Sequence, residues 1–359
     1  MRLLVVTNDY PPKPGGIQQY LGNLVGAYPH PVHVVAPADP RAEPDERVTR
    51  GRHRFLWPTR STRELVVAAA ERFRPDVVLF GAPHPLPAMG PDLRRRLGVP
   101  YGIVAHGAEV TIPAVVPVVR SRLAGLFADA DVRFAVSRYT ARRVERLCGA
   151  PVDYLGAGVD VDEFHPSTSP RSDEVPVVGC VSRFVPRKGQ DRLLRAVARL
   201  DRPVRVLLVG KGRKERSLRR LAARLGLDVR FEIDVPWERL ADCYRAMDVF
   251  AMPCRTRWFG LEVEGLGLVF LEAAASGLPV LAGDSGGAPE TVVPGRTGFV
   301  VRSLDDLVEG LEMLLDDPDL ARSMGEAGRR RVEEEFVWSA VVDRLEEGLR
   351  RAVFRKGAP

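Results

Sequence analysis

The sequence predicts an α/β protein made of two doubly wound domains, each with a parallel sheet covered by helices. Short apolar runs of strand length alternate with stretches of helical periodicity along all 359 residues. Loops containing glycine follow several of these runs, as they do at the carboxyl ends of parallel strands. A polar, proline-bearing stretch at 166–174 divides the alternation into two halves. We expect the carboxyl edges of the two sheets to face each other across a cleft.

The first half contains apolar runs that are typical of buried parallel strands, beginning with residues 2–7. The expected strands are 2–7, 31–36, 75–80, 99–105 and 131–136. Between them lie stretches with helical spacing of apolar residues. The expected helices are 17–27, 60–73 and 138–147. Residues 1–165 therefore form the first predicted domain.

The second half repeats the alternation and predicts a domain over residues 175–336. The expected strands are 175–181, 204–209, 229–233, 249–253 and 279–282, and a turn at 295–298 is expected between short strands. The expected helices are 190–200, 215–225, 238–247, 268 to about 276, 303–316 and 319–336. An amphipathic helix from 338 to about 354 is expected to pack back toward the first domain, within a terminal segment 337–359.

Composition and charge indicate a globular protein with anionic partners. The net charge is +6 and the pI is near 9.3, which favours nucleotide diphosphates or acidic lipid surfaces. Nucleic acid is disfavoured, because the positive residues are spread along helices without interleaved aromatic residues. Residues 1–7 are too short a run for a signal peptide, and no run approaches the roughly 18 apolar residues of a spanning helix. Four cysteines without paired metal spacing are typical of reduced thiols in the cytoplasm.

Two candidate ligand contacts lie in the first domain, at the carboxyl ends of expected strands. Gly15 and Gly16 open the helix at 17–27, where a phosphate or sugar can approach the backbone. His106 ends the strand at 99–105 and falls on the same edge. Each has a purely structural alternative, since the glycines also fit a simple turn and single histidines are often structural.

The loop and helix start around Glu264 form the main candidate site of the second domain. Gly265, Leu266, Gly267 and Leu268 lead from the loop into the helix, so free N–H groups and the helix dipole can bind an anion. Glu264 precedes the helix and Glu272 lies inside it. Carboxylates beside a phosphate site suit hydroxyl groups, such as those of sugars on either side of a diphosphate. Taken alone, the pair fits two surface charges at a helix start better than a binding site.

Arg183 and Lys188 lie in the run 182–189 (SRFVPRKG), directly after the first strand of the second domain. An arginine fork and a lysine point charge together suit a diphosphate held at that edge. We expect Arg187, between them, to be solvated, which is the usual state of arginine. These cations and helix dipoles can stabilise a leaving diphosphate without a metal ion.

The Glu264–Glu272 spacing, the Gly-Leu-Gly loop and the run 182–189 together resemble the retaining glycosyltransferases of the GT-B fold. This resemblance implies two Rossmann-like domains, an N-terminal one for the acceptor and a C-terminal one for a nucleotide-sugar donor. It implies front-face attack, in which a donor phosphate oxygen accepts the acceptor's proton. No metal or other cofactor is required in this mechanism.

The resemblance also assigns roles to the candidate residues. Arg183 and Lys188 would neutralise the donor diphosphate, Glu272 would bind the ribose hydroxyls, and Glu264 would hold the hexose hydroxyls. The backbone around Val235 would contact the base, and Gly16 would contact the diphosphate on closure. His106 would contact the hexose or act near the reacting carbon. The implied catalytic group is His106, Arg183, Lys188 and Glu264, and Gly265, Leu266, Gly267 and Leu268 would complete the donor site.

The runs 7–18, 182–191 and 260–267 look like those of the actinobacterial phosphatidylinositol mannosyltransferases, over nearly the whole chain. The likeness is greatest to the members that transfer a second mannose from GDP-mannose to the inositol of the monomannoside. One departure lies at 106–109, where His-Gly-Ala-Glu replaces the His-Gly-His-Glu of that family. The alternatives are a related hexosyltransferase with another donor or a soluble acceptor, and a non-catalytic nucleotide-sugar-binding protein.

A lipid acceptor requires contact with a membrane. The segment 110–122 is apolar and then basic, and further arginines lie at 94–96 and 138–146. Such segments can dock on anionic lipid, although a buried segment beside solvated arginines fits the pattern equally well. The expected location is the cytoplasm, with peripheral association at the inner face of the cell membrane.

Overall fold

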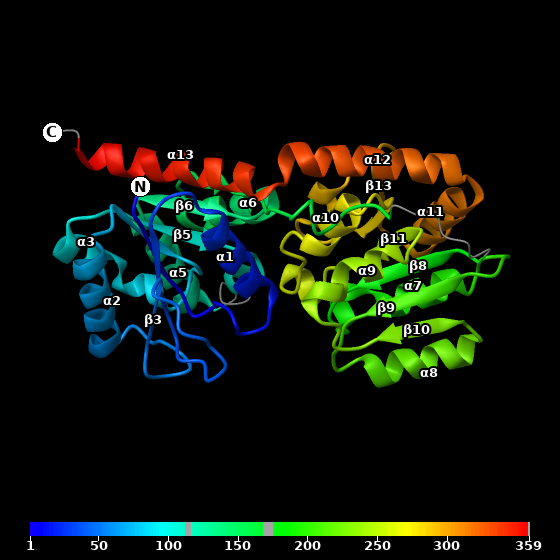
Figure 1. The fold of residues 1–359 in the computed structure, drawn as a ribbon, viewed down its shortest axis with the longest axis horizontal. Coiled ribbons are helices and arrows are strands. Elements are labelled where there is room, and N and C mark those ends of the chain that lie inside the picture. The colour runs from blue at the N-terminus through cyan, green and yellow to red at the C-terminus, as the bar shows by residue number, and fades with distance from the viewer. Residues whose placement is uncertain (112–115, 168–174, 358–359) are drawn as a thin grey trace. The chain divides into compact units, whose positions relative to one another are not determined.

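The computed structural model describes residues 1–111, 116–167 and 175–357 (Figure 1). Contacts between residues divide the chain into two compact units. Unit 1 comprises Met1–Gly158 with Trp338–Pro359, and unit 2 comprises Val159–Val337. Most of the expected linker at 166–174 lies outside the described residues, as do residues 112–115 of the expected lipid-docking segment.

The boundary between the units lies before residue 159, earlier than the expected end of the first domain at 165. The backbone N–H of Val159 donates to the carbonyl of Phe336 at 2.7 Å. The guanidinium of Arg329 donates to the carbonyl of Phe164 at 2.6 Å, and the Phe164 ring lies edge-on to that of Tyr244. These contacts join residues 159–165 to unit 2.

The described part of unit 1 contains a sheet of seven parallel strands in the order β3-β2-β1-β4-β5-β6-β7. The strands are β1 Leu3–Val6, β2 Val32–Ala36, β3 Val48–Arg50, β4 Val77–Phe80, β5 Tyr101–Ala105, β6 Val132–Ala135 and β7 Asp153–Tyr154. Every residue of β1, β4 and β5 is buried, which explains their nearly uninterrupted apolar sequences.

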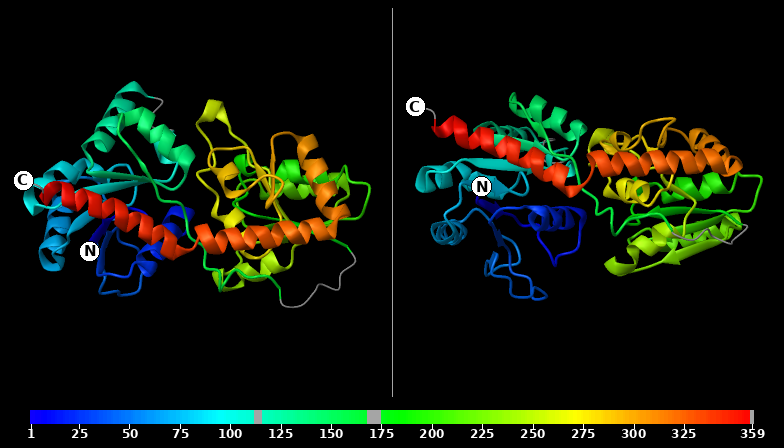
Figure 2. Two further views of the ribbon diagram at one scale, coloured as in Figure 1. Left: turned by 90° about the horizontal axis from the view of Figure 1, so that it is seen from above. Right: turned by 45° about the horizontal axis from the view of Figure 1, so that its top comes forward.

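Six helices precede the crossing into unit 2, and a seventh returns to unit 1 within the described residues. They are α1 Gly16–Ala27, α2 Arg60–Phe73, α3 Gly90–Leu97, α4 Ala108–Thr111, α5 Pro117–Asp129, α6 Arg138–Cys148 and α13 Trp338–Gly357. Helix α13 packs against α1 and β6, and its course over unit 1 can be followed in Figure 2. The Trp338 ring lies 5.4 Å from that of Tyr20, and Arg344 donates to the carbonyl of Leu155 at 2.8 Å.

The described part of unit 2 contains six parallel strands in the order β10-β9-β8-β11-β12-β13. The strands are β8 Val177–Val181, β9 Arg205–Val209, β10 Val229–Glu232, β11 Val249–Met252, β12 Val280–Gly283 and β13 Gly298–Val301. The helices are α7 Gln190–Val197, α8 Glu215–Leu225, α9 Leu240–Arg245, α10 Leu268–Ala275, α11 Leu304–Asp316 and α12 Pro318–Glu335. Helix α10 packs against α12, and α7 packs against α8 and α11.

Several elements differ from the sequence-based expectation. Strands β3 and β7 and helices α3, α4 and α5 were not expected. The two strands are short edge strands, and their residues are only partly buried, so they lack an apolar signature. The expected helix 190–200 ends at Val197, and 238–247 is a 3₁₀ turn followed by α9. The turn at 295–298 leads into β13 but is preceded by an isolated bridge at Pro294 rather than a strand.

The strand orders place one topological switch point in each unit. In unit 1 the order reverses between β1 and β4, and in unit 2 it reverses between β8 and β11. In open α/β sheets, ligands bind beyond the carboxyl ends of the strands at such a point. The loop after β8 contains residues 182–189, and the loop after β11 contains residues 253–267. The main candidate residues therefore lie where this topology places a ligand.

Candidate functional site

A buried ion pair lies between the two loops at the switch point of unit 2. The ammonium of Lys188 lies 2.8 Å from Oε2 of Glu264, and each side chain is only 9% exposed. Lys188 ends a 3₁₀ turn, Pro186–Lys188, that directs it inward from the β8 loop. Burial favours the neutral acid, but the charges of Lys188, Arg187 and Arg183 outweigh it, so the pKa of Glu264 lies below its ordinary value.

Arg187 belongs to this cluster, and the expectation that it is solvated is wrong. Its Nε lies 4.0 Å from Oε2 of Glu264, and its side chain is only 16% exposed. The same short turn that directs Lys188 inward carries Arg187 with it. Arg183, in contrast, is exposed at the start of the loop. At this edge of the unit 2 sheet, Lys188 and Arg187 point inward at the Glu264 carboxylate, and Arg183 stays accessible to solvent.

Glycine permits the close approach of the two loops. Gly189 has a φ of +78°, and a Cβ at this position would overlap the carbonyl of Pro253 in the β11 loop. The backbone N–H of Arg255 donates to the carbonyl of Arg187 at 2.8 Å, which adds a direct link between the loops. The Arg255 guanidinium also binds both carboxylate oxygens of Asp191 at 3.1 Å. These contacts hold the cations of one loop against the carboxylate of the other.

The loop after β12 supports the backbone of Glu264. Gly287 donates its N–H to the Glu264 carbonyl at 2.9 Å, and the Glu264 N–H donates to Oγ of Ser285 at 3.3 Å. Gly286 has a φ of +59°, and a Cβ there would overlap the same Glu264 carbonyl. The run 284–290 (DSGGAPE) thus positions Glu264 from a third loop.

The candidate anion site at the start of α10 has the expected local form. Gly267 is the N-cap residue, with a left-handed backbone and no side-chain capping bond. The first N–H groups of a helix lack intrahelical partners, so those near Leu268 can point at an anion. Gly265 is half-buried and Leu266 is buried beside them. Lys188, Glu264 and this helix start therefore belong to one edge of one sheet.

Glu272 lies inside α10 and is 8% exposed. The hydroxyl of Tyr244, on α9, donates to its Oε2 at 2.6 Å. Burial raises the pKa of Glu272 to about 7; the bond from Tyr244 opposes this shift, the charge of Glu163 adds to it, and Lys188 opposes it. The two glutamates thus differ, since Glu264 is paired with a cation and Glu272 with a neutral hydroxyl.

Val235 lies in the loop after β10, the strand at the edge of the sheet opposite β13. It is half-buried, next to Asp234, whose φ is +53° and whose carboxylate pairs with Lys211. Among the described hydrogen bonds, none links Val235 to Lys188, Glu264 or Glu272. The expected base contact at Val235 stays a prediction.

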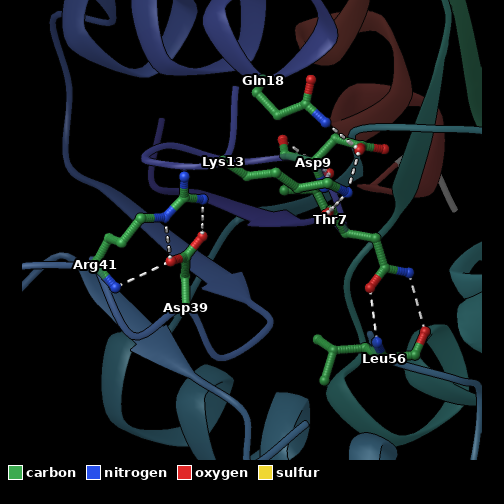
Figure 3. A network of polar contacts seen from close by, with 8 residues as sticks. Thr7, Asp9, Lys13, Gln18, Asp39, Arg41 and Leu56 are labelled. Atoms are coloured by element: carbon green, nitrogen blue, oxygen red, sulfur yellow. Dashed lines mark hydrogen bonds and ion pairs between the residues drawn. The ribbon is translucent and has the colours of Figure 1, made fainter. Parts of the chain in front are cut away.

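Gly16 begins α1 in unit 1, after a loop organised around Asp9. Figure 3 shows Lys13 and Gln18 both directed at the Asp9 carboxylate, with the Lys13 ammonium at 3.1 Å. The Asp9 N–H donates to Oγ1 of Thr7 at 2.9 Å. Gly16 itself is exposed, and a Cβ there would meet no atom within 4 Å. The start of α1 is therefore open to a ligand.

His106 follows β5 and is 9% exposed. Its Nε2 lies 2.9 Å from the carbonyl of Gly81, so this nitrogen donates. The ring lies edge-on to Tyr20, with centroids 5.2 Å apart. Glu109 accepts hydrogen bonds from the backbone N–H groups of His106 and Gly107. These contacts fix the ring orientation, and among the described residues no hydrogen bond to Nδ1 is seen.

The structure brings part of the expected set together within unit 2, namely Arg183, Lys188, Glu264, Gly265, Leu266, Gly267, Leu268 and Glu272. Gly16 and His106 belong to unit 1. Within the described ranges, no group of three or more His, Cys, Asp or Glu side chains is arranged to hold a metal ion.

Comparison with known proteins identifies the family of the chain. Residues 161–331 match the model described as "Glycosyl transferases group 1", and residues 14–163 match "Glycosyltransferase Family 4". A relative from Mycolicibacterium smegmatis, named GDP-mannose-dependent alpha-(1-6)-phosphatidylinositol monomannoside mannosyltransferase, is 41% identical, covering 97% of this chain and 98% of its own. A relative from Corynebacterium glutamicum, named for the monoacylated form of that monomannoside, is 39% identical over 96% of both chains. The chain belongs to the family 4 glycosyltransferases.

Solved structures confirm the GT-B fold of this glycosyltransferase. HepE from Anabaena, in complex with UDP, aligns with a TM-score of 0.81 and 21% identity over 97% of this chain and 99% of its own. Sucrose-phosphate synthase from Thermosynechococcus elongatus aligns with a TM-score of 0.79 and 23% identity over 99% of both chains. At these identities the likeness shows the fold alone.

Sequence reasoning missed two residues at the site of this glycosyltransferase. Arg187 was expected to be solvated, because that is the usual state of arginine. Its place on a three-residue turn beginning at Pro186 was the available signal. Tyr244 carried no motif, and its bond to Glu272 joins residues 28 positions apart on different helices.

Proposed function

We propose that this glycosyltransferase transfers mannose from GDP-mannose to phosphatidylinositol monomannoside, forming an α-(1-6) bond and giving the dimannoside. The observation that carries the proposal is the 41% identity, over 97% of this chain, to a relative named for that donor and that acceptor. Relatives from Corynebacterium glutamicum and Mycobacterium tuberculosis, at 39% and 40% identity over nearly the full chain, carry the same donor in their names.

The proposed diphosphate site consists of Arg183, Lys188 and the start of α10. Burial has already removed most water from Lys188, so its charge acts on the diphosphate in a low dielectric. Charge develops on the diphosphate as the sugar–phosphate bond breaks. Preorganised cations and helix N–H groups stabilise that charge more strongly than they stabilise the bound donor. A phosphate oxygen of the departing group takes the proton of the acceptor hydroxyl.

The proposed sugar contacts involve the two glutamates. Glu264, ionised and held by three loops, accepts hydrogen bonds from the mannose hydroxyls. Glu272 accepts bonds from the ribose hydroxyls. In unit 1, Gly16 leaves room for the diphosphate and Nδ1 of His106 contacts the mannose. Val235 contacts the base through its backbone. Each role rests on resemblance to the family, supported by the position and burial described above.

A donor comparison tests the proposed function. Thermal stabilisation by GDP-mannose is measured beside UDP-glucose, UDP-N-acetylglucosamine and ADP-glucose. We expect selective stabilisation by GDP-mannose, followed by formation of a dimannoside from the purified monomannoside. Selective stabilisation by another donor would discard the named substrate. Donor binding without transfer or hydrolysis would support a non-catalytic role instead.

We further propose that the first turn of α5 docks on anionic lipid at the inner face of the cell membrane, where a lipid acceptor resides. Val116, the residue before α5, and Val118, in its first turn, are 53% and 61% exposed, and Arg120 and Arg122 in the first two turns are also exposed. Exposed aliphatic side chains beside arginines suit the boundary between headgroups and acyl chains. None of the helices formed by residues 1–111, 116–167 and 175–357 is long and apolar enough to cross a bilayer.

Vesicle sedimentation tests this docking. Wild-type protein should bind phosphatidylglycerol vesicles, and Val118→Asp should reduce binding roughly ten-fold because a carboxylate replaces an inserted side chain. Met313→Asp is the matched control, since Met313 is a 39% exposed apolar residue on α11 of unit 2. Equal loss in both variants, or no binding by the wild type, would contradict the docking proposal.

A further inference from the structure

We propose that Tyr244 is a positioning residue for the donor: its hydroxyl orients the Glu272 carboxylate so that Oε1 faces the ribose. The inference rests on the proposed function in one respect, that the donor carries a ribonucleoside diphosphate bound at Glu272. It adds a residue outside the loops and helix start that make up the expected donor site.

The contact is short, buried and isolated from solvent. Tyr244 is fully buried, and its hydroxyl donates to Oε2 of Glu272 at 2.6 Å. The Tyr244 ring is fixed between two others, with the Phe164 centroid at 5.6 Å and the Phe250 centroid at 5.8 Å. A hydroxyl on a ring held this firmly presents its hydrogen from one fixed position.

One oxygen of Glu272 remains for a ligand. Oε2 accepts the bond from Tyr244, whereas Oε1 accepts no hydrogen bond from any residue that the structure describes. The terminal torsion of a glutamate side chain is broad and has no strong preference of its own. The carboxylate plane therefore needs an external contact to set it, and the Tyr244 hydroxyl supplies that contact.

The bond from Tyr244 also bears on the charge of Glu272. Burial raises the pKa of Glu272, and the hydroxyl of Tyr244 counters that shift by stabilising the carboxylate. A carboxylate can accept bonds from two ribose hydroxyls, whereas a protonated acid loses acceptor capacity. Tyr244 thus favours both the orientation and the ionised form that suit ribose.

Other buried tyrosines provide a contrast. The Tyr20 hydroxyl donates to the backbone carbonyl of Gly156 at 2.9 Å, in unit 1. The Tyr101 hydroxyl is buried without a hydrogen-bond partner in the structure. Among these three, Tyr244 alone uses its hydroxyl on a carboxylate, and that carboxylate is the one expected at the ribose. Tyr101→Phe is therefore a matched control, because it removes a buried hydroxyl that does not contact Glu272.

The test compares ribose and deoxyribose nucleotides. Calorimetry measures binding of GDP, 2′-deoxy-GDP and 3′-deoxy-GDP to the wild type, Tyr244→Phe, Glu272→Gln and Tyr101→Phe. The wild type should bind GDP roughly 10- to 100-fold more tightly than the analogue lacking the contacted hydroxyl, as for hydrogen bonds to charged groups. In Tyr244→Phe, the ratio of the affinity for GDP to that for this analogue should fall to about three-fold or less. A misaligned Glu272 carboxylate no longer forms a good hydrogen bond with the ribose hydroxyl. Tyr101→Phe should keep the wild-type ratio.

Steady-state kinetics add a second readout. Tyr244→Phe should raise KM for the donor about ten-fold and leave kcat within about two-fold, because ribose binding is common to the ground and transition states. Thermal unfolding checks that the phenyl ring preserves the packing with Phe164 and Phe250. If Tyr244→Phe does not fold, the GDP to deoxy-GDP affinity ratio is measured in Glu272→Gln instead. A ratio lower than in the wild type supports the contact between Glu272 and the ribose that Tyr244 orients. An unchanged ratio overturns the inference.

The outcomes separate this inference from the proposed function. An unchanged ribose ratio in folded Tyr244→Phe, with GDP-mannose still used, overturns the role of Tyr244 and leaves the function standing. If the wild type prefers another nucleotide, the proposed donor fails. The same ribose and deoxyribose comparison with that nucleotide then decides the role of Tyr244, because the ribose is common to these donors.

Discussion

The two sheets offer a ligand the same topological position but surround it with different chemistry. In unit 2, the loops beside the switch point hold a desolvated ion pair, Lys188–Glu264, with Arg187 close to it. In unit 1, the loop after β1 holds an ion pair, Lys13–Asp9, in which the lysine side chain is 42% exposed. Among the described residues, the His106 ring, on the same edge of unit 1, forms a hydrogen bond only to backbone and packs edge-on with the neutral ring of Tyr20.

From this difference we propose that stabilisation of the transition state is concentrated at the edge of unit 2. A desolvated cation acts strongly on developing charge, whereas an exposed one is screened by water and salt. We therefore expect changes at the edge of unit 2 to alter turnover by orders of magnitude. Changes at the edge of unit 1 should alter ligand affinity more modestly.

Lys188→Ala should give the largest effect. Loss of the cation removes transition-state stabilisation of the diphosphate, and kcat should fall about 10²- to 10³-fold, measured with radiolabelled donor. The variant also leaves Glu264 buried without its main partner, so the free energy of unfolding should fall by about 3 kcal/mol. Lys211→Ala is the control, because Lys211 pairs with Asp234 at an exposed position. Activity near the wild-type level in Lys188→Ala would contradict the proposal that Lys188 stabilises the diphosphate.

The pH dependence of stability should separate Glu272 from Glu264. The pKa of Glu272 is raised from 4.5 to about 7 in the folded protein, so between these values the folded state binds more protons than the unfolded chain. The free energy of unfolding therefore decreases as the pH rises from 4.5 to 7, by about 3 kcal/mol, and then levels off. Urea unfolding at pH 5 and pH 8 should show that Glu272→Gln loses this component.

Glu264 should contribute with the opposite sign. Its pKa is lowered in the folded state, so its contribution to stability is present above the ordinary pKa of a glutamate. That contribution is lost as the pH falls through the lowered value. Glu264→Gln should thus destabilise the protein at pH 7, where Glu272→Gln should stabilise it. The same sign in both variants would contradict the contrast between the carboxylate paired with a cation and the one bonded to a hydroxyl.

Gly16→Ala should have a smaller effect, and only on the ligand. A Cβ at Gly16 meets no protein atom within 4 Å, so the thermal unfolding temperature should not fall. If the donor diphosphate contacts this position, the added methyl group should weaken donor binding roughly ten-fold. Gly26→Ala, at another position of α1 with open space, is the matched control. Equal donor binding in the two variants would exclude contact at Gly16.

Removal of metal ions should have the smallest effect. In the proposed site, Lys188, Arg183 and the start of α10 supply the positive charge that a divalent cation supplies in other transferases. Transfer activity should therefore stay unchanged in EDTA, measured against the same assay with added Mg²⁺. A loss of activity that Mg²⁺ restores would show that these groups are insufficient.

The strands that are fully buried could be predicted from the sequence. Strands β1, β5 and β8 are apolar throughout and fully buried, so periodicity was enough to find them. Strand β3 has three half-buried residues and β7 has two, too few for a pattern. Helix α5 begins inside a valine-rich run whose helical spacing is weak. An edge strand forms because it pairs with a neighbouring strand, and the local sequence gives no sign of that pairing.

The site was predictable where its residues form a motif in the chain. Lys188 and Glu264 were both expected, because each stands beside glycines after a strand, but their direct pairing depends on how two loops meet. Arg187 was expected to be solvated because arginine side chains usually are, whereas a three-residue turn directs it inward. Tyr244 acts through a contact between helices α9 and α10, and such contacts leave no local signal.

Helix α13 has a consequence for the way this protein is made. Unit 2 is continuous in the chain, whereas unit 1 is completed only by the segment that begins at Trp338. On the ribosome, the surface of α1 and β6 that α13 covers stays open until residues 338–357 emerge. Unit 2 can complete its fold before unit 1, against the usual order of synthesis. Nascent chains that stop before residue 338 should consequently be targets for chaperones and proteases, and isolation of unit 1 for study requires a fusion of its two segments.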